Sequence, residues 1–292
     1  MSDSTCRNPV SARIDALWLY PIKGCRGFRV PGATLAQTGL EVDGIGDREW
    51  VVVDESGEFL SQRELPKMAL IETRLTGESL RVRAPDMLQL DVPFASEGEV
   101  LTVKVWNDEV AAVTQGEIAD AWLTQFLGLR CRLMRFDPEA SRVSNHKYTG
   151  AVTAPYKFAD AFALLVCSTA SLADLNDRLA KKGVAAVTIE RFRPNIVLDG
   201  LEAFDEDYID QIVINGAIND ARLHVVKPCV RCTVPNVDLA TGKAGFEPGA
   251  TLATFRNDTR AGGLTFGVNA IVGAGAGTRL STGDAVEVSL RF

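Results

Sequence analysis

The sequence is poor in the residues and patterns that mark several functional classes. Its 292 residues include two histidines and no Gly-x-Ser-x-Gly sequence, which leaves little room for a Ser-His-acid catalytic triad. No apolar run approaches the roughly 18 residues of a membrane-spanning helix, and the first ten residues lack the pattern of an export signal. Lys and Arg number 31 against 38 Asp and Glu, an acidic balance that argues against a nucleic-acid partner. We therefore expect a cytoplasmic protein that binds neither membrane nor nucleic acid.

Cysteines are also few, and only two of the six lie close together, in Pro-Cys229-Val-Arg-Cys232. This number does not support a disulfide framework. Structural zinc and iron–sulfur clusters need four ligands, and a thioredoxin-like pair would open a helix, whereas a loop or strand is expected after Cys232. Two interpretations remain open from the residues alone: one thiolate activated by Lys227 and Arg231, or two buried and inert cysteines.

Hydrophobic periodicity predicts a mainly β protein with a few helices, of the α+β class. Apolar residues alternate with polar ones over 80–84, 88–92 and 101–105, which is typical of half-buried antiparallel strands. The polar stretch 132–151 has little periodicity and indicates a boundary. We expect two β-rich domains, comprising residues 13–135 and 136–292.

Two helices are predicted within these domains. In the first, apolar residues recur at i, i+4 and i+8 from Ile118, and Gly128 is the expected stop. The second is expected to begin near Ser168, with Ser171 and Asp174 forming a capping box.

Three basic residues lie at expected strand ends, beside glycine or proline: Lys23, Arg48 and Arg193. Arginine offers a bidentate fork to phosphate, and glycine lets the backbone approach closely. Each residue taken singly is typical of a solvated surface charge. Together they indicate a phosphate site, provided that the fold brings them together.

Several of these motifs resemble those of MOSC-domain proteins that carry an N-terminal MOSC-associated β-barrel domain. The N-terminal domain is indicated by Tyr20-Pro-Ile-Lys-Gly-Cys-Arg-Gly27, Asp47-Arg-Glu-Trp50 and Ser61-Gln-Arg63. The MOSC domain is indicated by Ser168-Thr-Ala-Ser-Leu-Ala-Asp-Leu-Asn176, Arg191-Phe-Arg-Pro-Asn-Ile-Val197, Pro228-Cys-Val-Arg-Cys232 and Phe266-Gly267. The resemblance covers about residues 13–290 and includes the mitochondrial amidoxime-reducing components and their bacterial counterparts. It implies an N-terminal β-barrel-like domain followed by a MOSC β-barrel domain with a few helices.

The resemblance also implies a molybdenum–pyranopterin cofactor (Mo-molybdopterin). Its metal ligand and catalytic residue would be Cys232, whereas Cys229 would not be a ligand. A thiolate suits a soft redox metal. The other residues that the resemblance places at the cofactor are Lys23, Gly24, Arg48, Ala161, Phe162, Arg193, Asn195 and Val230.

The activity implied by the resemblance is reduction of N-hydroxylated compounds (amidoximes, hydroxylamines and N-hydroxylated bases), with the N–O bond cleaved at molybdenum. Because no ferredoxin domain or membrane anchor is recognised, electrons are expected from a separate ferredoxin, cytochrome b5-like protein or reductase. His146 is a candidate proton donor. The alternative is a carrier of molybdenum cofactor or of a Cys232 persulfide, as in cofactor sulfurases. Pyridoxal phosphate binding is associated with the family at large, but no pyridoxal-phosphate desulfurase domain is recognised here.

Overall fold

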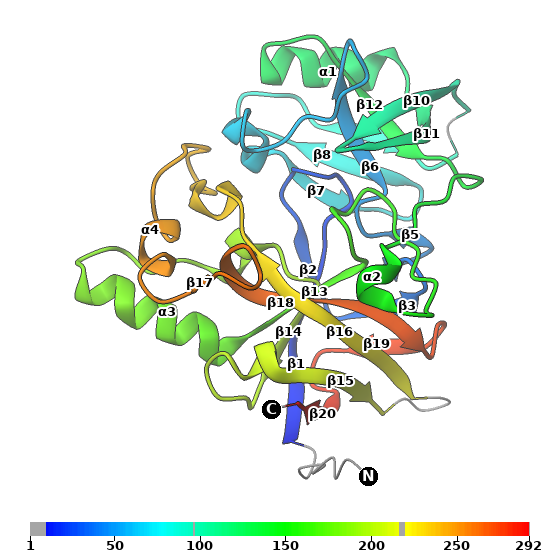
Figure 1. Cartoon of the computed structure of the whole chain (residues 1–292). Helices are drawn as coiled ribbons and strands as arrows, with labels where there is room; N and C mark the ends of the chain where they lie inside the picture. Colours follow the sequence, from blue (N-terminus) through cyan, green and yellow to red (C-terminus); the bar gives the residue numbers. More distant parts are fainter. Residues whose placement is uncertain (1–9, 96, 216–219, 292) are drawn as a thin grey trace.

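Seven strands close into a barrel in the computed structural model, which describes residues 10–95, 97–215 and 220–291 (Figure 1). Their order is β13-β14-β1-β20-β15-β16-β18, and the circle is closed because β13 also pairs with β18. The bounds are β1 (Val10–Leu19), β13 (Leu164–Ser168), β14 (Ile196–Asp199), β15 (Ile209–Ile214), β16 (Ala221–Val230), β18 (Gly263–Ala274) and β20 (Ala285–Leu290). Two short strands extend the sheet, β2 (Phe28–Val30) beside β1 and β17 (Asn257–Asp258) beside β18.

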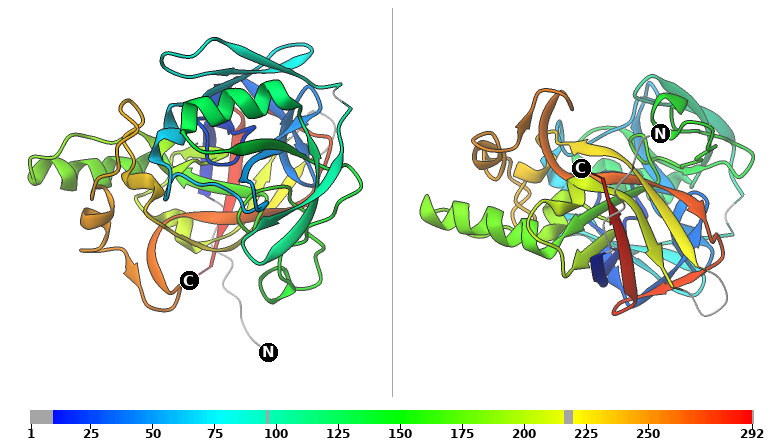
Figure 2. Two further views of the ribbon diagram at one scale, coloured as in Figure 1. Left: turned by 90° about the horizontal axis from the view of Figure 1, so that it is seen from above. Right: turned by 60° about the horizontal axis from the view of Figure 1, so that its bottom comes forward.

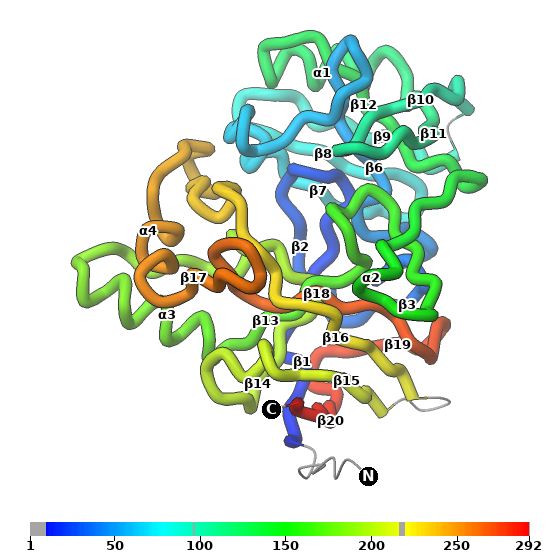
Figure 3. The backbone as a smooth tube through the Cα atoms, viewed as in Figure 1, coloured from blue at the N-terminus to red at the C-terminus, as the bar shows by residue number. Residues whose placement is uncertain are grey.

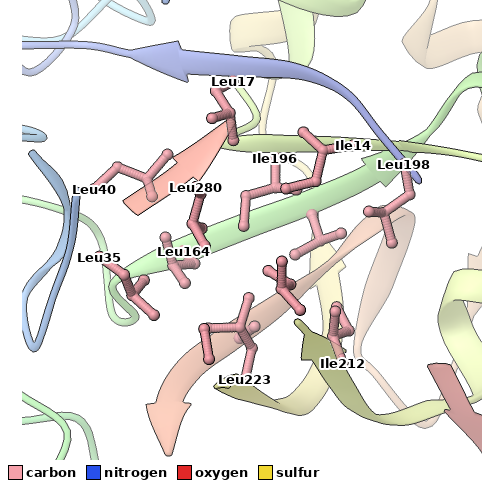
Figure 4. Close-up of a cluster of buried hydrophobic side chains, with 14 of the residues drawn as sticks. Ile14, Leu17, Leu35, Leu40, Leu164, Ile196, Leu198, Ile212, Leu223 and Leu280 are labelled. Carbon is pink, nitrogen blue, oxygen red and sulfur yellow. The ribbon is translucent and has the colours of Figure 1, made fainter. Parts of the chain in front are cut away.

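The barrel is filled by the inward-facing side chains of these strands (Figure 4). In β20, for example, Val286 and Val288 are buried while their neighbours are exposed, as the period of two requires. Ile14, Ile196 and Ile212 contribute from three other strands. A closed sheet leaves few exposed edges, so the barrel is a stable base for the loops at its ends.

Three smaller sheets make up most of the N-terminal part of the chain. The first joins β10 (Val100–Val105), β11 (Asp108–Thr114), β12 (Cys131–Phe136) and β6 (Trp50–Asp54). The second joins β7 (Glu72–Leu75), β8 (Ser79–Arg83) and β9 (Leu90–Pro93), and the third joins β19 (Arg279–Ser281), β3 (Gly32–Ala36), β4 (Gly39–Val42) and β5 (Ile45–Gly46). The predicted strands at 80–84, 88–92 and 101–105 are confirmed as β8, β9 and β10, except that Leu88 lies outside β9 and is 87% exposed. The mainly β fold with a few helices is confirmed as well.

The two parts of the chain exchange strands. The first strand, β1, belongs to the barrel, and β19 from the C-terminal part pairs with β3. We retain 13–135 and 136–292 as a proposed division into domains, with these strands donated across it. The expected boundary stretch 132–151 starts too early, because β12 continues to Phe136 with Leu133 and Met134 buried against β6.

The described helices are α1 (Glu117–Leu127), α2 (His146–Thr149), α3 (Thr169–Lys181) and α4 (Gly249–Leu252). Short 3-10 turns are η1 (Pro66–Leu70), η2 (Ile189–Phe192), η3 (Asp205–Tyr208) and η4 (Val234–Asn236). In Figure 2, α3 projects to one side of the barrel in both views, and Figure 3 shows the chain from η4 to β17 running beside it. None of these helices is long and apolar enough to cross a membrane, over the part of the chain that the structure describes.

Both predicted helices exist, but two details are wrong. Gly128 does end α1, in the left-handed conformation with φ 82°. Ile118, however, is 78% exposed, because the buried face is formed by Ala119, Trp122, Leu123, Phe126 and Leu127. The predicted start of the second helix near Ser168 is confirmed, since α3 begins at Thr169. The capping box from Ser171 to Asp174 is wrong, because Ser168 is the N-cap and its hydroxyl accepts the hydrogen bond from the Ser171 backbone N–H at 3.1 Å.

The carboxyl group of Glu206, in η3, is buried against the first residues of α3. Glu206 Oε2 accepts hydrogen bonds from the hydroxyls of Ser171 (2.7 Å) and Ser168 (3.0 Å). Among the described residues its Oε1 has no partner. Burial raises the pKa of Glu206 above its ordinary value, despite these hydrogen bonds.

Glu206→Gln is expected to flatten part of the pH dependence of stability. Below the unfolded pKa of about 4.3 both states are protonated, so the group contributes nothing. As pH rises toward the higher folded pKa, the unfolded chain releases this proton first, and the free energy of unfolding falls. The stability of the wild type relative to E206Q should therefore decline as the pH rises above about 4, as followed by urea unfolding. Parallel pH curves for the two proteins would contradict this.

Candidate functional site

A cavity of about 420 Å³ lies between the barrel and the N-terminal sheets. It is lined by residues from distant parts of the chain, which are brought to one place by the ends of β1, β6, β13 and β16. All nine residues singled out from the sequence line it: Lys23, Gly24, Arg48, Ala161, Phe162, Arg193, Asn195, Val230 and Cys232. The condition set for a phosphate site, that the basic loops meet in space, is therefore fulfilled.

Two arginines, Arg48 and Arg193, form one wall of this cavity, and both lie against the buried ring of Tyr20. The guanidinium carbons of Arg48 and Arg193 each lie 4.4 Å from the ring centroid of Tyr20. Arg48 donates from Nη2 to the Arg193 carbonyl (3.0 Å), and Arg193 donates from Nη1 to the Cys25 carbonyl (2.5 Å). Both arginines have left-handed backbones, with φ 47° and 59°, a costly conformation for such residues. The surrounding contacts thus hold two cations side by side.

One hydrogen-bond donor of this wall, on the Arg193 guanidinium, has no acceptor among the described residues. Arg193 Nη2 is buried and has no hydrogen-bond partner among the described residues. Burial, together with the neighbouring Arg48, lowers the pKa of Arg193 to about 10, so the side chain remains charged at neutral pH. A buried, unpaired guanidinium donor fits an oxyanion such as phosphate, which would accept its hydrogen bond and offset the charge.

Asn195 is hydrogen-bonded to the Arg48 side chain of this wall. Its Oδ1 accepts hydrogen bonds from Arg48 Nη1 (3.2 Å) and from the backbone N–H of Leu165 (3.1 Å), and its side chain is buried. The amide oxygen is thus already engaged within the protein. Asn195 therefore orients Arg48 in this structure.

The second basic element is Lys23, which is buried at the end of the loop after β1. Its Nζ donates to the Phe158 carbonyl (2.8 Å) and to Asp160 Oδ1 (2.5 Å). Burial lowers the pKa of Lys23, although Asp160 opposes this effect. The next residue, Gly24, has φ 81°, and a Cβ there would lie 2.9 Å from Met68 Cε, so a larger residue would be strained.

The sulfur-bearing wall follows the end of β16. Arg231 Nη1 donates to Cys229 Sγ at 3.0 Å, and its Nη2 donates to the Phe192 carbonyl at 2.8 Å. The Arg231 side chain is therefore hydrogen-bonded to Cys229, whereas Cys232 is exposed and forms no disulfide. Lys227 Nζ lies 4.7 Å from the Tyr148 ring centroid. The interpretation of two buried cysteines is wrong, because Cys229 is only partly buried and Cys232 is exposed. The loop or strand expected after Cys232 is instead a short 3-10 turn, η4, although no α-helix begins there.

The segment before β13 completes the enclosure. Ser144 Oγ donates to the Ala161 carbonyl (2.7 Å), while Arg142 Nη1 donates to the carbonyls of Lys157 (2.7 Å) and Ala159 (3.1 Å). These bonds fix the backbone that carries Ala161 and Phe162.

The candidate proton donor His146 is exposed on α2, with Nδ1 2.9 Å from the Gly150 carbonyl. It is not among the residues that line the cavity.

Sequence reasoning missed an aromatic and acidic corner of the cavity. It is formed by Phe59, Arg63, Trp106 and Asp160. Trp106 and Asn107 form the two-residue turn between β10 and β11, and an apolar residue in such a turn is the one local signal that could have drawn attention to it. The proximity of Trp106 to Asp160 has no sequence signal, since 54 positions separate them.

Comparison with known proteins defines the class of this molecule. Residues 11–130 match the MOSC N-terminal beta barrel domain, and residues 153–287 match the MOSC domain.

Most of the chain is similar to curated relatives of three kinds. It is 32% identical to mitochondrial amidoxime reducing component 2 of Bos taurus, over 83% of this chain and 72% of that protein. It is 33% identical to mitochondrial amidoxime-reducing component 1 of Homo sapiens, over 82% and 71%. It is 29% identical to molybdenum cofactor sulfurase of Danio rerio, over 92% of this chain but 33% of that protein. The chain belongs to the family of the amidoxime-reducing components.

Proposed function

We propose that this protein is a molybdenum-cofactor-dependent oxidoreductase that reduces N-hydroxylated compounds. The observation that carries the proposal is a single cavity holding a free thiol, Cys232, opposite a buried and unpaired arginine donor, Arg193. This combination fits a group that carries both a phosphate and a soft metal. The names of the relatives support the reaction: amidoxime reducing components and a molybdenum cofactor sulfurase.

In this proposal the residues of the cavity have distinct roles toward Mo-molybdopterin. Cys232 is the thiolate ligand and the catalytic residue, and Lys23, Arg48 and Arg193 bind the phosphate. Gly24, Ala161, Phe162 and Val230 offer backbone groups, and Asn195 holds Arg48 in place. When bound, the cofactor supplies two electrons at its metal. These electrons and two protons convert an amidoxime to an amidine and water.

The electrons are proposed to come from a separate protein, such as a ferredoxin, a cytochrome b5-like protein or a reductase. A cytoplasmic location is part of the same proposal. The reaction itself can be tested without a natural electron donor.

The direct test supplies electrons from reduced viologen to the molybdenum-loaded protein and measures benzamidine formed from benzamidoxime. Turnover that is absent from metal-free protein is the expected result. A folded protein with bound molybdenum and pterin that reduces neither benzamidoxime nor an N-hydroxylated base would refute the proposed reaction.

A second function, the handling of cofactor or sulfur, is favoured by the zebrafish sulfurase, whose similarity spans 92% of this chain. In that function Cys232 would carry a persulfide, and its exposed position suits transfer. Cyanide-labile sulfur that is lost in Cys232→Ser, together with absence of turnover, would favour this alternative over reduction.

A further inference from the structure

Lys227, near the end of β16, is a cation of the cavity that no described carboxylate neutralises. Its side chain lines the cavity, and its ammonium forms no ion pair or hydrogen bond with the described residues. Asp160, the one carboxylate among the described residues of the lining, is bound to Lys23 instead. Because a charge in a partly enclosed cavity loses hydration, an anion that binds beside Lys227 would stabilise it.

Two aromatic rings hold the Lys227 ammonium in place. Its Nζ lies 4.7 Å from the centroid of the Tyr148 ring and 5.8 Å from that of the Phe162 ring. The two rings contact each other edge to face, with their centroids 5.9 Å apart. Ring faces attract a cation but offer no oxygen or nitrogen acceptor, so the ammonium keeps its N–H donors for a ligand.

Asn269 on β18 adds a second donor beside this cation. Lys227 and Asn269 are partners in the ladder between β16 and β18, and a register shift between Val225 and Lys227 marks a bulge there. Bulges next to functional sites redirect side chains. Asn269 also lines the cavity, and its side-chain amide has no hydrogen-bond partner among the described residues. One wall thus presents an ammonium and an amide whose donors meet no acceptor in the described part of the chain.

We propose that Lys227 and Asn269 bind a carboxylate on the substrate, so that the protein favours N-hydroxylated compounds that carry this group. The single charge and two oxygens of a carboxylate match one ammonium and one amide N–H. A phosphate monoester carries nearly two charges, which suit the three cations Lys23, Arg48 and Arg193 better. This inference rests on the proposed function and specifies a part of the substrate remote from the N–O bond.

The binding test measures the Kd for benzoate by calorimetry, on protein purified from a host that makes the cofactor. Lys227→Met keeps the length of the side chain and removes its charge, so the Kd is expected to rise about tenfold through loss of a charge-assisted hydrogen bond. Lys147→Met is the matched control. Lys147 Nζ lies 5.6 Å from the same Tyr148 ring, but Lys147 is exposed and is not among the cavity-lining residues. K147M should therefore bind benzoate as the wild type does.

Asn269→Asp is an independent variant, because it preserves the shape of the side chain and places a carboxylate where it competes with the ligand for the Lys227 ammonium. Its benzoate Kd is also expected to rise about tenfold. Circular dichroism verifies that each variant is folded. Equal benzoate affinity in the wild type, K227M and N269D overturns the subsite. Loss of molybdenum and pterin from K227M at unchanged benzoate affinity also overturns it, and would assign Lys227 to the cofactor.

Turnover separates this inference from the proposed function. With reduced viologen as donor, the kcat/KM for 4-(hydroxyamino)benzoate relative to that for N-phenylhydroxylamine is expected to fall about tenfold in K227M and to stay unchanged in K147M. An unchanged ratio in K227M would contradict selection by Lys227. If the wild type binds benzoate through Lys227 but reduces neither compound, the proposed function fails while the subsite stands.

Discussion

Replacing Cys232 by serine is expected to abolish molybdenum retention and to reduce benzamidoxime turnover by at least about 100-fold. Residues that merely support a metal ligand typically cost 10- to 100-fold when replaced, so a ligand itself should cost at least the upper end of that range. Serine keeps the size of the side chain but is a far poorer ligand for a soft metal than a thiolate. Metal analysis by mass spectrometry and the viologen assay measure the two effects.

Cys229→Ser is the matched control for this prediction. Cys229 lies three positions away, and its sulfur accepts a hydrogen bond from Arg231. A serine oxygen can accept the same bond, so molybdenum content is expected to stay within about twofold of the wild type. Equal losses in the two variants would show that neither thiol alone holds the metal. Full activity in C232S would remove Cys232 from the chemistry.

Arg142→Ala is expected to lower the free energy of unfolding by about 3 kcal/mol, the second large effect. The buried guanidinium donates to the carbonyls of Lys157 and Ala159 and to Asp108, and it lies 4.5 Å from the Tyr156 ring centroid. Truncation leaves two partly buried carbonyls without this donor, and an unsatisfied buried group costs about 1–3 kcal/mol. For a chain of this size the melting temperature should fall by roughly 6–12 °C.

The same substitution should also weaken cofactor retention, because Arg142 fixes the backbone that leads to Ala161 and Phe162. Arg81→Ala is its control. Arg81 forms an exposed ion pair with Asp91 at 2.8 Å, and solvent screening leaves such pairs with little effect on stability. Similar melting temperatures for R142A and R81A would mean that residues 157–162 are held by other contacts.

Most of the nine proposed site residues were named because their motifs resemble those of the MOSC family, whereas the residues alone indicated a site at Lys23, Arg48 and Arg193 only on condition that the fold brings them together. Arg48 and Arg193 are 145 positions apart, yet each is followed within a few residues by a strand, β6 or β14, that carries it to the cavity. The strands themselves follow from alternation of apolar residues, as in β8 and β10. Alternation of apolar and polar residues is enough to predict a strand where one face of that strand is buried.

Other features depend on contacts that local sequence does not encode. The buried face of α1 is set by packing against β9 and β12, which left Ile118 outside. The contact of the N-cap residue Ser168 with Glu206, 38 positions later, is one of these contacts. The pairing of Asp160 with Trp106 is likewise a product of the assembled fold. Long-range polar contacts of this kind have no periodicity by which to recognise them.

The central claim, that the cavity holds Mo-molybdopterin, is tested most directly by one analysis of the wild-type protein purified from a host that makes the cofactor. Molybdenum is quantified by mass spectrometry, and pterin by its fluorescence after oxidation. The account predicts close to one molybdenum and one pterin per chain. A folded protein that carries neither would contradict it.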